Sequence, residues 1–287
     1  MKIHHWLSIV IFVLVFFATV AGLYYQTPGS PVEFTTIRGE PAVFQGSGLY
    51  RFDPAVLARE GKIWDAVNLF IGLPLFGLAV FFSSRNSLRG KLILSGLLFY
   101  FFYVYLQLMT MYAFNFMFLV YVAVYALSAV AFFLNLAEID VSRLPFRVSD
   151  RFPRRLFIGY TFFVSAMLLF LWLVRIIPLM KSGLFPPELA GMSTLETQGF
   201  DLGMVVPLMF CSGIALWRRS AWGYFLASLS LSYGLLMSLT LPAWIAIPLI
   251  QDGKTNLVEA IPFLVICVIG ITLFGLFFGN VRGEIDA

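Results

Sequence analysis

Apolar residues follow one another along this chain in runs of about twenty, which is enough for a helix to cross a bilayer with a hydrocarbon layer of ~30 Å. Short polar connections separate the runs. Only helices and closed barrels satisfy their backbone polar groups in lipid, so each run predicts one membrane-spanning helix. The predicted spans are Trp6–Tyr25, Ile63–Phe82, Leu92–Thr110, Phe116–Leu136, Leu156–Leu179, Leu202–Trp217, Ala221–Trp244 and Ala260–Gly279.

Two of the runs need interpretation. The apolar stretch 92–136 exceeds twice the bilayer thickness, so it is predicted as two helices with a turn around residues 111–115. The stretch 221–250 is too long for one upright span, and Pro242 and Pro248 favour a bend in its last turns. We expect an all-α membrane protein with eight transmembrane helices in a single domain (1–287), without a tandem or inverted repeat.

The longest polar stretch, residues 26–62, separates the first two predicted spans. Residues 31–38 alternate with β-branched and aromatic side chains, Gly39 and Glu40 favour a turn, and residues 42–45 supply a returning strand. A lone hairpin is marginally stable in water. The stretch is therefore predicted to form a small extracytoplasmic cap that packs on the helix ends.

The second part of the cap begins with Asp53 and Pro54, a typical N-cap and first-turn pair. They predict a helix from Pro54 towards Lys62. Its apolar positions, which include Val56 and Leu57, suit a helix that lies on the membrane surface.

Composition and charge agree with a membrane location and add an orientation. The chain is 60% apolar and 12% charged, against about 25% charged residues in a typical soluble domain. With the N-terminus inside, eight spans place most Arg and Lys residues in cytoplasmic loops, as the positive-inside rule requires. Both termini are therefore expected in the cytoplasm. The basic residues are scattered without interleaved aromatics, so no nucleic-acid partner is expected.

Polar residues gather near the outer ends of the predicted helices and form the candidate ligand-binding site. Asp65 and Asp201 open predicted spans, where a helix dipole favours an acid, and Arg175 is expected to pair with one of them. A tyrosine face on the third span could line a polar cavity or pack with hydrogen bonds. The candidate residues are Asp65, Asn68, Tyr103, Gln107, Asn115, Trp172, Arg175, Glu196 and Asp201.

Signatures of known chemistry are missing. The chain has no nucleotide-binding glycine loop, no HExxH and no GxSxG sequence, and its histidines are only His4 and His5. Cys211 and Cys267 lie in apolar runs without metal-ligand spacing. We expect no catalytic residue, metal or cofactor.

Small residues recur at helix-packing spacing. Gly275 and Gly279 form GxxxG, and Ser230, Gly234 and Ser238 follow every four residues. Such rows let helices approach closely in lipid. Packing within the bundle and association with another chain both fit this pattern.

Three stretches together resemble a known group of proteins: TTIRGEPAVFQGSGLYRFD, DAVNLFIGLPL and FDLGMVVPLMFCSGIALWRRSAWGY. They are similar to an uncharacterised family of bacterial polytopic inner-membrane proteins. The resemblance implies residence in a bacterial plasma membrane. It implies no activity.

These observations favour a membrane protein that binds or passes a small molecule or a lipid at the extracytoplasmic mouth of its bundle. Two alternatives stay open: an accessory or scaffold subunit that packs against another membrane protein or a second copy, and a membrane enzyme acting on a lipid-linked substrate through Asp65, Asp201 or Glu196.

Overall fold

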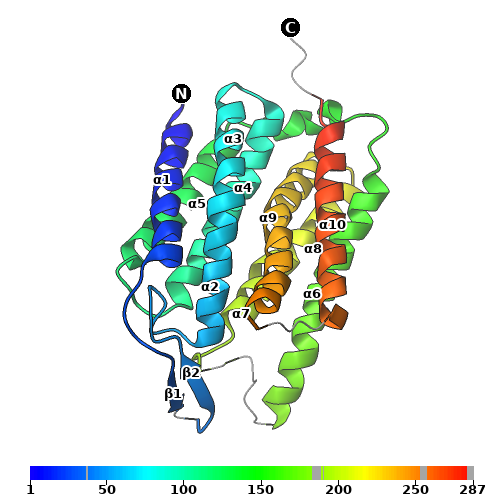
Figure 1. Cartoon of the computed structure of the whole chain (residues 1–287). Coiled ribbons are helices and arrows are strands. Elements are labelled where there is room, and N and C mark those ends of the chain that lie inside the picture. Colours follow the sequence, from blue (N-terminus) through cyan, green and yellow to red (C-terminus); the bar gives the residue numbers. More distant parts are fainter. Residues whose placement is uncertain (37, 183–188, 190, 253–256, 283–287) are drawn as a thin grey trace.

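The computed structural model describes the chain except residues 37, 183–188, 190, 253–256 and 283–287. It is mostly helical (76%) and is drawn in Figure 1. The helices and strands are α1 (Ile3–Tyr24), β1 (Val32–Thr35), β2 (Pro41–Phe44), α2 (Ala55–Val67), the π-helical turn η1 (Asn68–Gly72), α3 (Leu73–Ser84), α4 (Leu88–Thr110), α5 (Phe118–Leu136), the 3₁₀ segment η2 (Val141–Arg147), α6 (Arg154–Ser182), α7 (Glu196–Phe200), the π-helical turn η4 (Asp201–Val205), α8 (Val206–Trp217), α9 (Ala221–Asp252) and α10 (Leu257–Asn280).

Seven helices among the described residues are long and apolar enough to cross a membrane, which is the architecture of an integral membrane protein. They correspond to the first seven predicted spans. In the last predicted span, the described stretch Cys267–Asn280 is apolar but shorter. We call the end of the bundle where α1 begins and α10 ends the terminal face, and the opposite end, where the hairpin lies, the cap face (Figure 1).

The predicted hairpin is present, and a helix does follow Pro54, but it is not a separate surface helix. β1 pairs antiparallel with β2, from Val32 opposite Phe44 to Thr35 opposite Pro41. The helix expected from Pro54 to Lys62 is instead the start of one continuous rod, in which α2, η1 and α3 together cover residues 55–84. The prediction was wrong because nothing in the sequence ends the helix at Lys62, so α2 continues through η1 into α3. Pro74 lies further along, in the first turn of α3, where the preceding π-helical turn accommodates the proline.

The two halves of the chain repeat one another, contrary to the sequence-based prediction. η1–α3 and η4–α8 match element for element with a constant numbering offset of 133 (Asn68 to Asp201), and α4 and α9 begin at that same offset. At this offset the identical pairs from Asn68 to the position of Leu108 are Leu69/Leu202, Pro74/Pro207, Leu75/Leu208, Arg85/Arg218, Ser87/Ser220, Gly90/Gly223, Ser95/Ser228, Leu98/Leu231, Tyr100/Tyr233, Leu106/Leu239 and Leu108/Leu241.

Backbone geometry repeats at the same positions. Asn86 (φ 60°) and its counterpart Arg219 (φ 57°) are the non-glycine residues with positive φ among those described. In both turns the next residue donates its N–H five residues back, Ser87 to Phe82 O and Ser220 to Ala215 O. α1 packs on η1 and α3 as α6 packs on η4 and α8, while α5 packs on α4 as α10 packs on α9. Each half is therefore one copy of a four-part unit.

The halves meet through their equivalent helices. An 18-residue stretch of α4 and one within residues 221–240 of α9 are each 72% buried, the highest share among the candidate spans, and the two helices pack on each other. A Cβ at Gly96 would lie 3.0 Å from the carbonyl oxygen of Leu229, its own counterpart. The rings of the equivalent Tyr100 and Tyr233 lie 6.5 Å apart. Contacts between equivalent residues place a pseudo-twofold axis here, parallel to the helices, as in membrane proteins with parallel repeats.

The small-residue rows have different environments. Near Gly275 and Gly279 a Cβ would meet no described atom within 4 Å, and both residues are exposed on α10. Ser230 instead lies 3.2 Å from Ser212 of α8. The row on α9 packs inside the bundle at Ser230, and the GxxxG row on α10 faces outward.

Candidate functional site

Asp65 lies near the end of α2 and is buried against α1. Tyr50, from the cap, donates a hydrogen bond of 2.7 Å from its hydroxyl to Asp65 Oδ2. Gly22 of α1 makes room for this carboxyl, because a Cβ there would lie 1.7 Å from the same oxygen. The carboxyl group of Asp65 thus joins α1, α2 and the cap at a single point.

Asn68, one turn further along the rod, is the first residue of η1. Its Oδ1 accepts a hydrogen bond of 2.7 Å from the hydroxyl of Tyr100 on α4. Its Nδ2 is buried and has no hydrogen-bond partner among the described residues. The side-chain amide of Asn68 therefore has N–H donors inside the bundle that no described residue accepts.

Asp201 is the counterpart of Asn68 in the second half and the first residue of η4. Its Oδ1 accepts a hydrogen bond of 2.6 Å from Tyr103 Oη of α4, and its Oδ2 accepts one of 3.0 Å from Trp172 Nε1 of α6. Tyr103 belongs to the first half, and Trp172 to the second. The carboxylate therefore bridges the two repeats through one donor from each.

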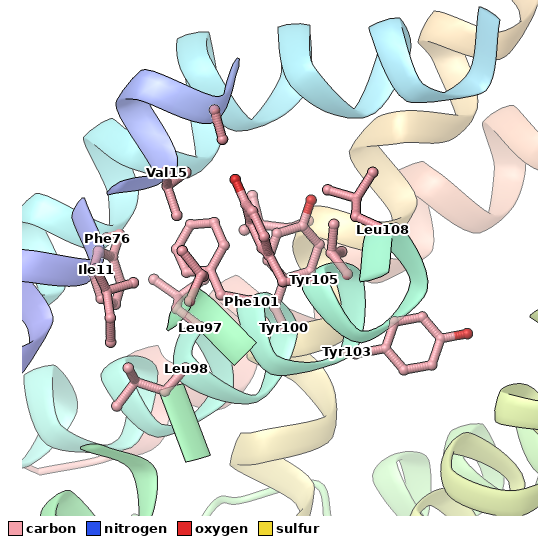
Figure 2. Close-up of a cluster of buried hydrophobic side chains, with 14 of the residues drawn as sticks. Ile11, Val15, Phe76, Leu97, Leu98, Tyr100, Phe101, Tyr103, Tyr105 and Leu108 are labelled. Carbon is pink, nitrogen blue, oxygen red and sulfur yellow. The ribbon is translucent and has the colours of Figure 1, made fainter. Parts of the chain in front are cut away.

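Tyr233 connects these two centres. Its ring lies 5.5 Å from that of Tyr103 and 6.5 Å from that of Tyr100. Asn68, Tyr100, Tyr233, Tyr103 and Asp201 consequently form a buried row across the pseudo-twofold axis, which we call the axial row. Figure 2 shows that Tyr103 leaves α4 in a different direction from Tyr100 and Tyr105, so α4 supplies side chains to both ends of the row.

The remaining predicted residues lie around this row. Arg175 is exposed, and its guanidinium carbon lies 5.8 Å from the centre of the Trp172 ring. Asn115 holds the turn before α5, because its Oδ1 accepts the Met117 N–H. Gln107 is buried on α4. Glu196 opens α7, and its Oε2 is buried without a hydrogen-bond partner among the described residues.

The cap covers both halves and is tightly packed where it meets α2. Arg38 in the hairpin turn donates to the carbonyl of Met192, which precedes α7 in the second half. A Cβ at Gly61 of α2 would lie 2.9 Å from ring atoms of both Tyr50 and Tyr112. Side chains therefore fill the space under the cap at this point. The polar row between the halves is the better candidate for a site.

Asp53 ties the cap to the turn between α4 and α5 instead of capping α2, as had been predicted. Its Oδ1 accepts a hydrogen bond of 2.6 Å from the N–H of Ala113, and α2 has Pro54 at its N-cap without a side-chain hydrogen bond. Burial raises the pKa of the Asp53 carboxyl to about 7, and the hydrogen bond from Ala113 opposes this rise. Its Oδ2 has no hydrogen-bond partner among the described residues.

Sequence reasoning missed Tyr50, Asp53 and Tyr233 as members of these clusters. Tyr100 had been placed on a tyrosine face of α4, but its link to Asn68 had not been predicted. For Tyr233 a signal did exist, since it is the repeat counterpart of Tyr100. For Tyr50 and Asp53 the cap sequence carries no pattern that pairs them with distant residues.

The axial row offers hydroxyl, amide and carboxylate groups in an apolar surrounding. An uncompensated polar group in such a place costs about 1–3 kcal/mol. Tyr105, also on α4, has a buried hydroxyl without a hydrogen-bond partner in the described part of the chain. The described residues contain no group of three His, Cys, Asp or Glu side chains that could hold a metal ion.

Comparisons with protein families, with curated proteins and with solved structures give no match to this chain.

Proposed function

We propose that the chain makes eight membrane passes, four in each half, with the cap face outside and both termini in the cytoplasm. The repeat supports the count, because it makes α10 the counterpart of α5, which is long enough to span. Arginines concentrated in the connections of the terminal face support the orientation. The resemblance to bacterial inner-membrane proteins supports residence in that membrane.

We further propose that the protein binds or passes a small polar molecule, or the polar part of a lipid, at the axial row. Repeat-built membrane proteins hold their ligands where the repeats meet. Here that interface contains a tyrosine cluster flanked by Asn68 in one half and Asp201 in the other. An ionisable residue inside a membrane bundle is itself a pointer to function.

The observation that carries this proposal is the unused hydrogen-bonding capacity of Asn68 Nδ2 and of the Tyr105 hydroxyl. Buried polar groups in native proteins are paired with protein or ordered water in the great majority of cases. These unpaired groups on η1 and α4 therefore mark a place for water or a ligand. In this proposal the ligand enters from the cap face, past Arg175 and Trp172.

Cysteine accessibility tests the proposal. In a background carrying Cys211→Ser and Cys267→Ser, Tyr103→Cys and Tyr233→Cys are treated with a membrane-impermeant thiosulfonate from the outside of sealed vesicles. Val104→Cys is the control, because Val104 is buried on the same helix next to Tyr103. We expect faster modification at 103 and 233 than at 104. Equal, negligible rates at all three positions would mean a dry core and would contradict the proposal.

A scaffold role, or self-association, is the second candidate, and the outward GxxxG row of α10 favours it. Light scattering on the protein purified in mild detergent gives its mass. We expect Gly275→Leu with Gly279→Leu to convert a dimer to a monomer. A wild-type protein that is already monomeric and brings no partner would count against this role.

A further inference from the structure

A cavity on the terminal face is separate from the axial row. It has a volume of about 510 Å³ and lies between the connection leading into α6 and the turn joining α8 to α9. The walls carry Arg154 and Arg155 from the first turn of α6 and Arg219 from the turn, with Ser149 and Tyr224 beside them. Three arginines from two distant segments therefore face one space.

The positive charge of this cavity is not neutralised within the described part of the chain. Asp150 is the acidic residue in its wall, and its carboxylate is engaged by Arg282 at 3.1 Å. Arg154 Nε is buried and has no hydrogen-bond partner among the described residues. Arginine presents a planar fork of donors that matches phosphate oxygens.

Comparison of the two repeats shows that Arg219 replaces an uncharged residue of the first half. Asn86 occupies the equivalent position in the first half with the same left-handed backbone. Asparagine adopts that conformation readily, whereas a long side chain is uncommon there. The second half thus carries a residue that suits the turn less well and adds a charge to the cavity. A binding role for the side chain accounts for this difference.

The surroundings of the cavity suit a ligand anchored in the membrane. Phe152 lines the cavity, and its ring is stacked on that of Phe157 at 4.8 Å and lies tilted at 5.7 Å from that of Tyr224. Trp217 and Trp222, at the ends of the α8–α9 turn, are exposed. Tryptophans gather at the level of lipid headgroups, and basic pockets between helices on this side of a bundle bind anionic headgroups.

From this arrangement we infer that the cavity bounded by Arg154, Arg155 and Arg219 binds a phosphate group, carried by an anionic lipid or by a soluble phosphate compound. The arginines hold the phosphate oxygens, and the N-terminus of α6 adds a favourable dipole.

The experiment measures binding of phosphatidylglycerol, phosphatidylcholine and inorganic phosphate to the purified full-length protein in detergent, by native mass spectrometry and by thermal shift. Arg219→Asn is the main variant, because it installs the residue that the first repeat uses at this turn and so preserves the backbone. Arg154→Gln is the second variant. Arg85→Gln is the control, since Arg85 also lies on the terminal face but away from the cavity.

We expect phosphatidylglycerol to bind more tightly than phosphatidylcholine, and each cavity variant to weaken it about tenfold, as the loss of one charge-assisted hydrogen bond predicts. The control should match the wild type. Loss of inorganic phosphate binding by the same variants, with no preference for phosphatidylglycerol, would assign the cavity to a soluble phosphate compound. Binding of both ligands that is unchanged in folded Arg219→Asn and Arg154→Gln would overturn the inference.

Discussion

At Gly22 of α1, the neighbouring side chains leave no space for a residue larger than glycine. The missing side chain leaves the space that the Asp65 carboxyl occupies, and the Tyr50 hydroxyl lies 3.1 Å from the same point. Any larger residue must displace a buried carboxyl that is held by its hydrogen bond to Tyr50. The cost is steric and also electrostatic, because a displaced Asp65 loses its donor.

We therefore expect Gly22→Ala to lower the free energy of unfolding by about 1–3 kcal/mol, the usual range for overpacking. Gly77→Ala is the matched control: it is also a helical glycine at the α1–α3 contact, but its nearest neighbour, a Phe12 ring carbon, would lie 3.5 Å from the new Cβ. The control should be neutral or gain up to ~1 kcal/mol from helix propensity. Thermal unfolding in one detergent measures both, and equal effects would contradict the packing argument.

Asp53 links stability to pH. Its pKa in the folded protein is about 7, above the usual value of 3.8, because burial disfavours the charged form. Between these two values the folded state binds more protons than the unfolded state, so this residue makes stability fall as pH rises from about 4 to about 7. Above pH 7 its effect is constant.

The measurement compares melting temperatures of the wild type and Asp53→Asn from pH 4.5 to 8. We expect the difference between the two proteins to favour the wild type at low pH and to shift towards the variant as pH approaches 7. A difference that is independent of pH would show that Asp53 does not titrate in this range.

At the scale of single elements, the repeat allows one half to serve as the control for the other. Ser87 caps α4, since its hydroxyl accepts the Gly90 N–H at 3.3 Å. Its counterpart Ser220 precedes α9, and there the Gly223 N–H bonds to the Ser220 backbone carbonyl. Among the described contacts, Ser220 makes no side-chain cap.

Ser87→Ala should therefore destabilise the protein by about 1 kcal/mol, a typical loss for an N-cap, and Ser220→Ala by much less. Chemical denaturation of the two variants under identical conditions provides the test. If both substitutions cost the same, the hydroxyl of Ser87 is not the source of the effect.

The elements themselves could largely be predicted from the sequence, because apolar run length is set directly by bilayer thickness. The cap hairpin followed from alternation and from Gly39, which adopts a φ of 83° in the turn. The surface helix was mispredicted because an acid followed by proline is also compatible with a helix that simply continues. Asp65 had been placed at the start of a span, whereas it lies well inside the continuous helix 55–84.

The candidate residues remain a prediction as a ligand-binding site, and the pairings that the structure shows among them were not predicted. Asp65, Asn68, Tyr103, Trp172 and Asp201 are all hydrogen-bonded side chains in the bundle. Which donor serves which acceptor depends on helix rotation and on the approach of distant segments, and no local pattern encodes either.

At the scale of the whole molecule, the repeat organises everything else, and its sequence signal is weak. Of the 41 matched positions from Asn68 to Leu108, only 11 carry the same residue in both halves. Several of these identities have backbone or polar roles, as at Pro74, Gly90 and Tyr100. Against a background that is 60% apolar, such sparse identities become visible only once the matching turns fix the offset.

Because each half is a complete unit, the chain should tolerate a break between the halves better than a break within one. Fragments 1–150 and 151–287, separated in the exposed connection before α6, each keep their own four-part packing and share the α4–α9 contact. A break after Arg219 cuts a turn held by three backbone hydrogen bonds, donated by Arg218, Arg219 and Ser220.

We expect the first pair of fragments, co-expressed with an affinity tag on one of them, to co-purify in mild detergent and to melt within about 10 °C of the intact protein, since joining the halves reduces only chain entropy. The pair broken after Arg219 should give less complex and a lower melting temperature, because its α8–α9 contact must also form between separate chains. Equal recovery of both pairs would mean that the repeats are not the units in which the protein is stabilised. If neither pair is recovered, the contacts on which stability depends include those of the α5–α6 connection, where the Arg282 N–H donates to the Arg147 carbonyl.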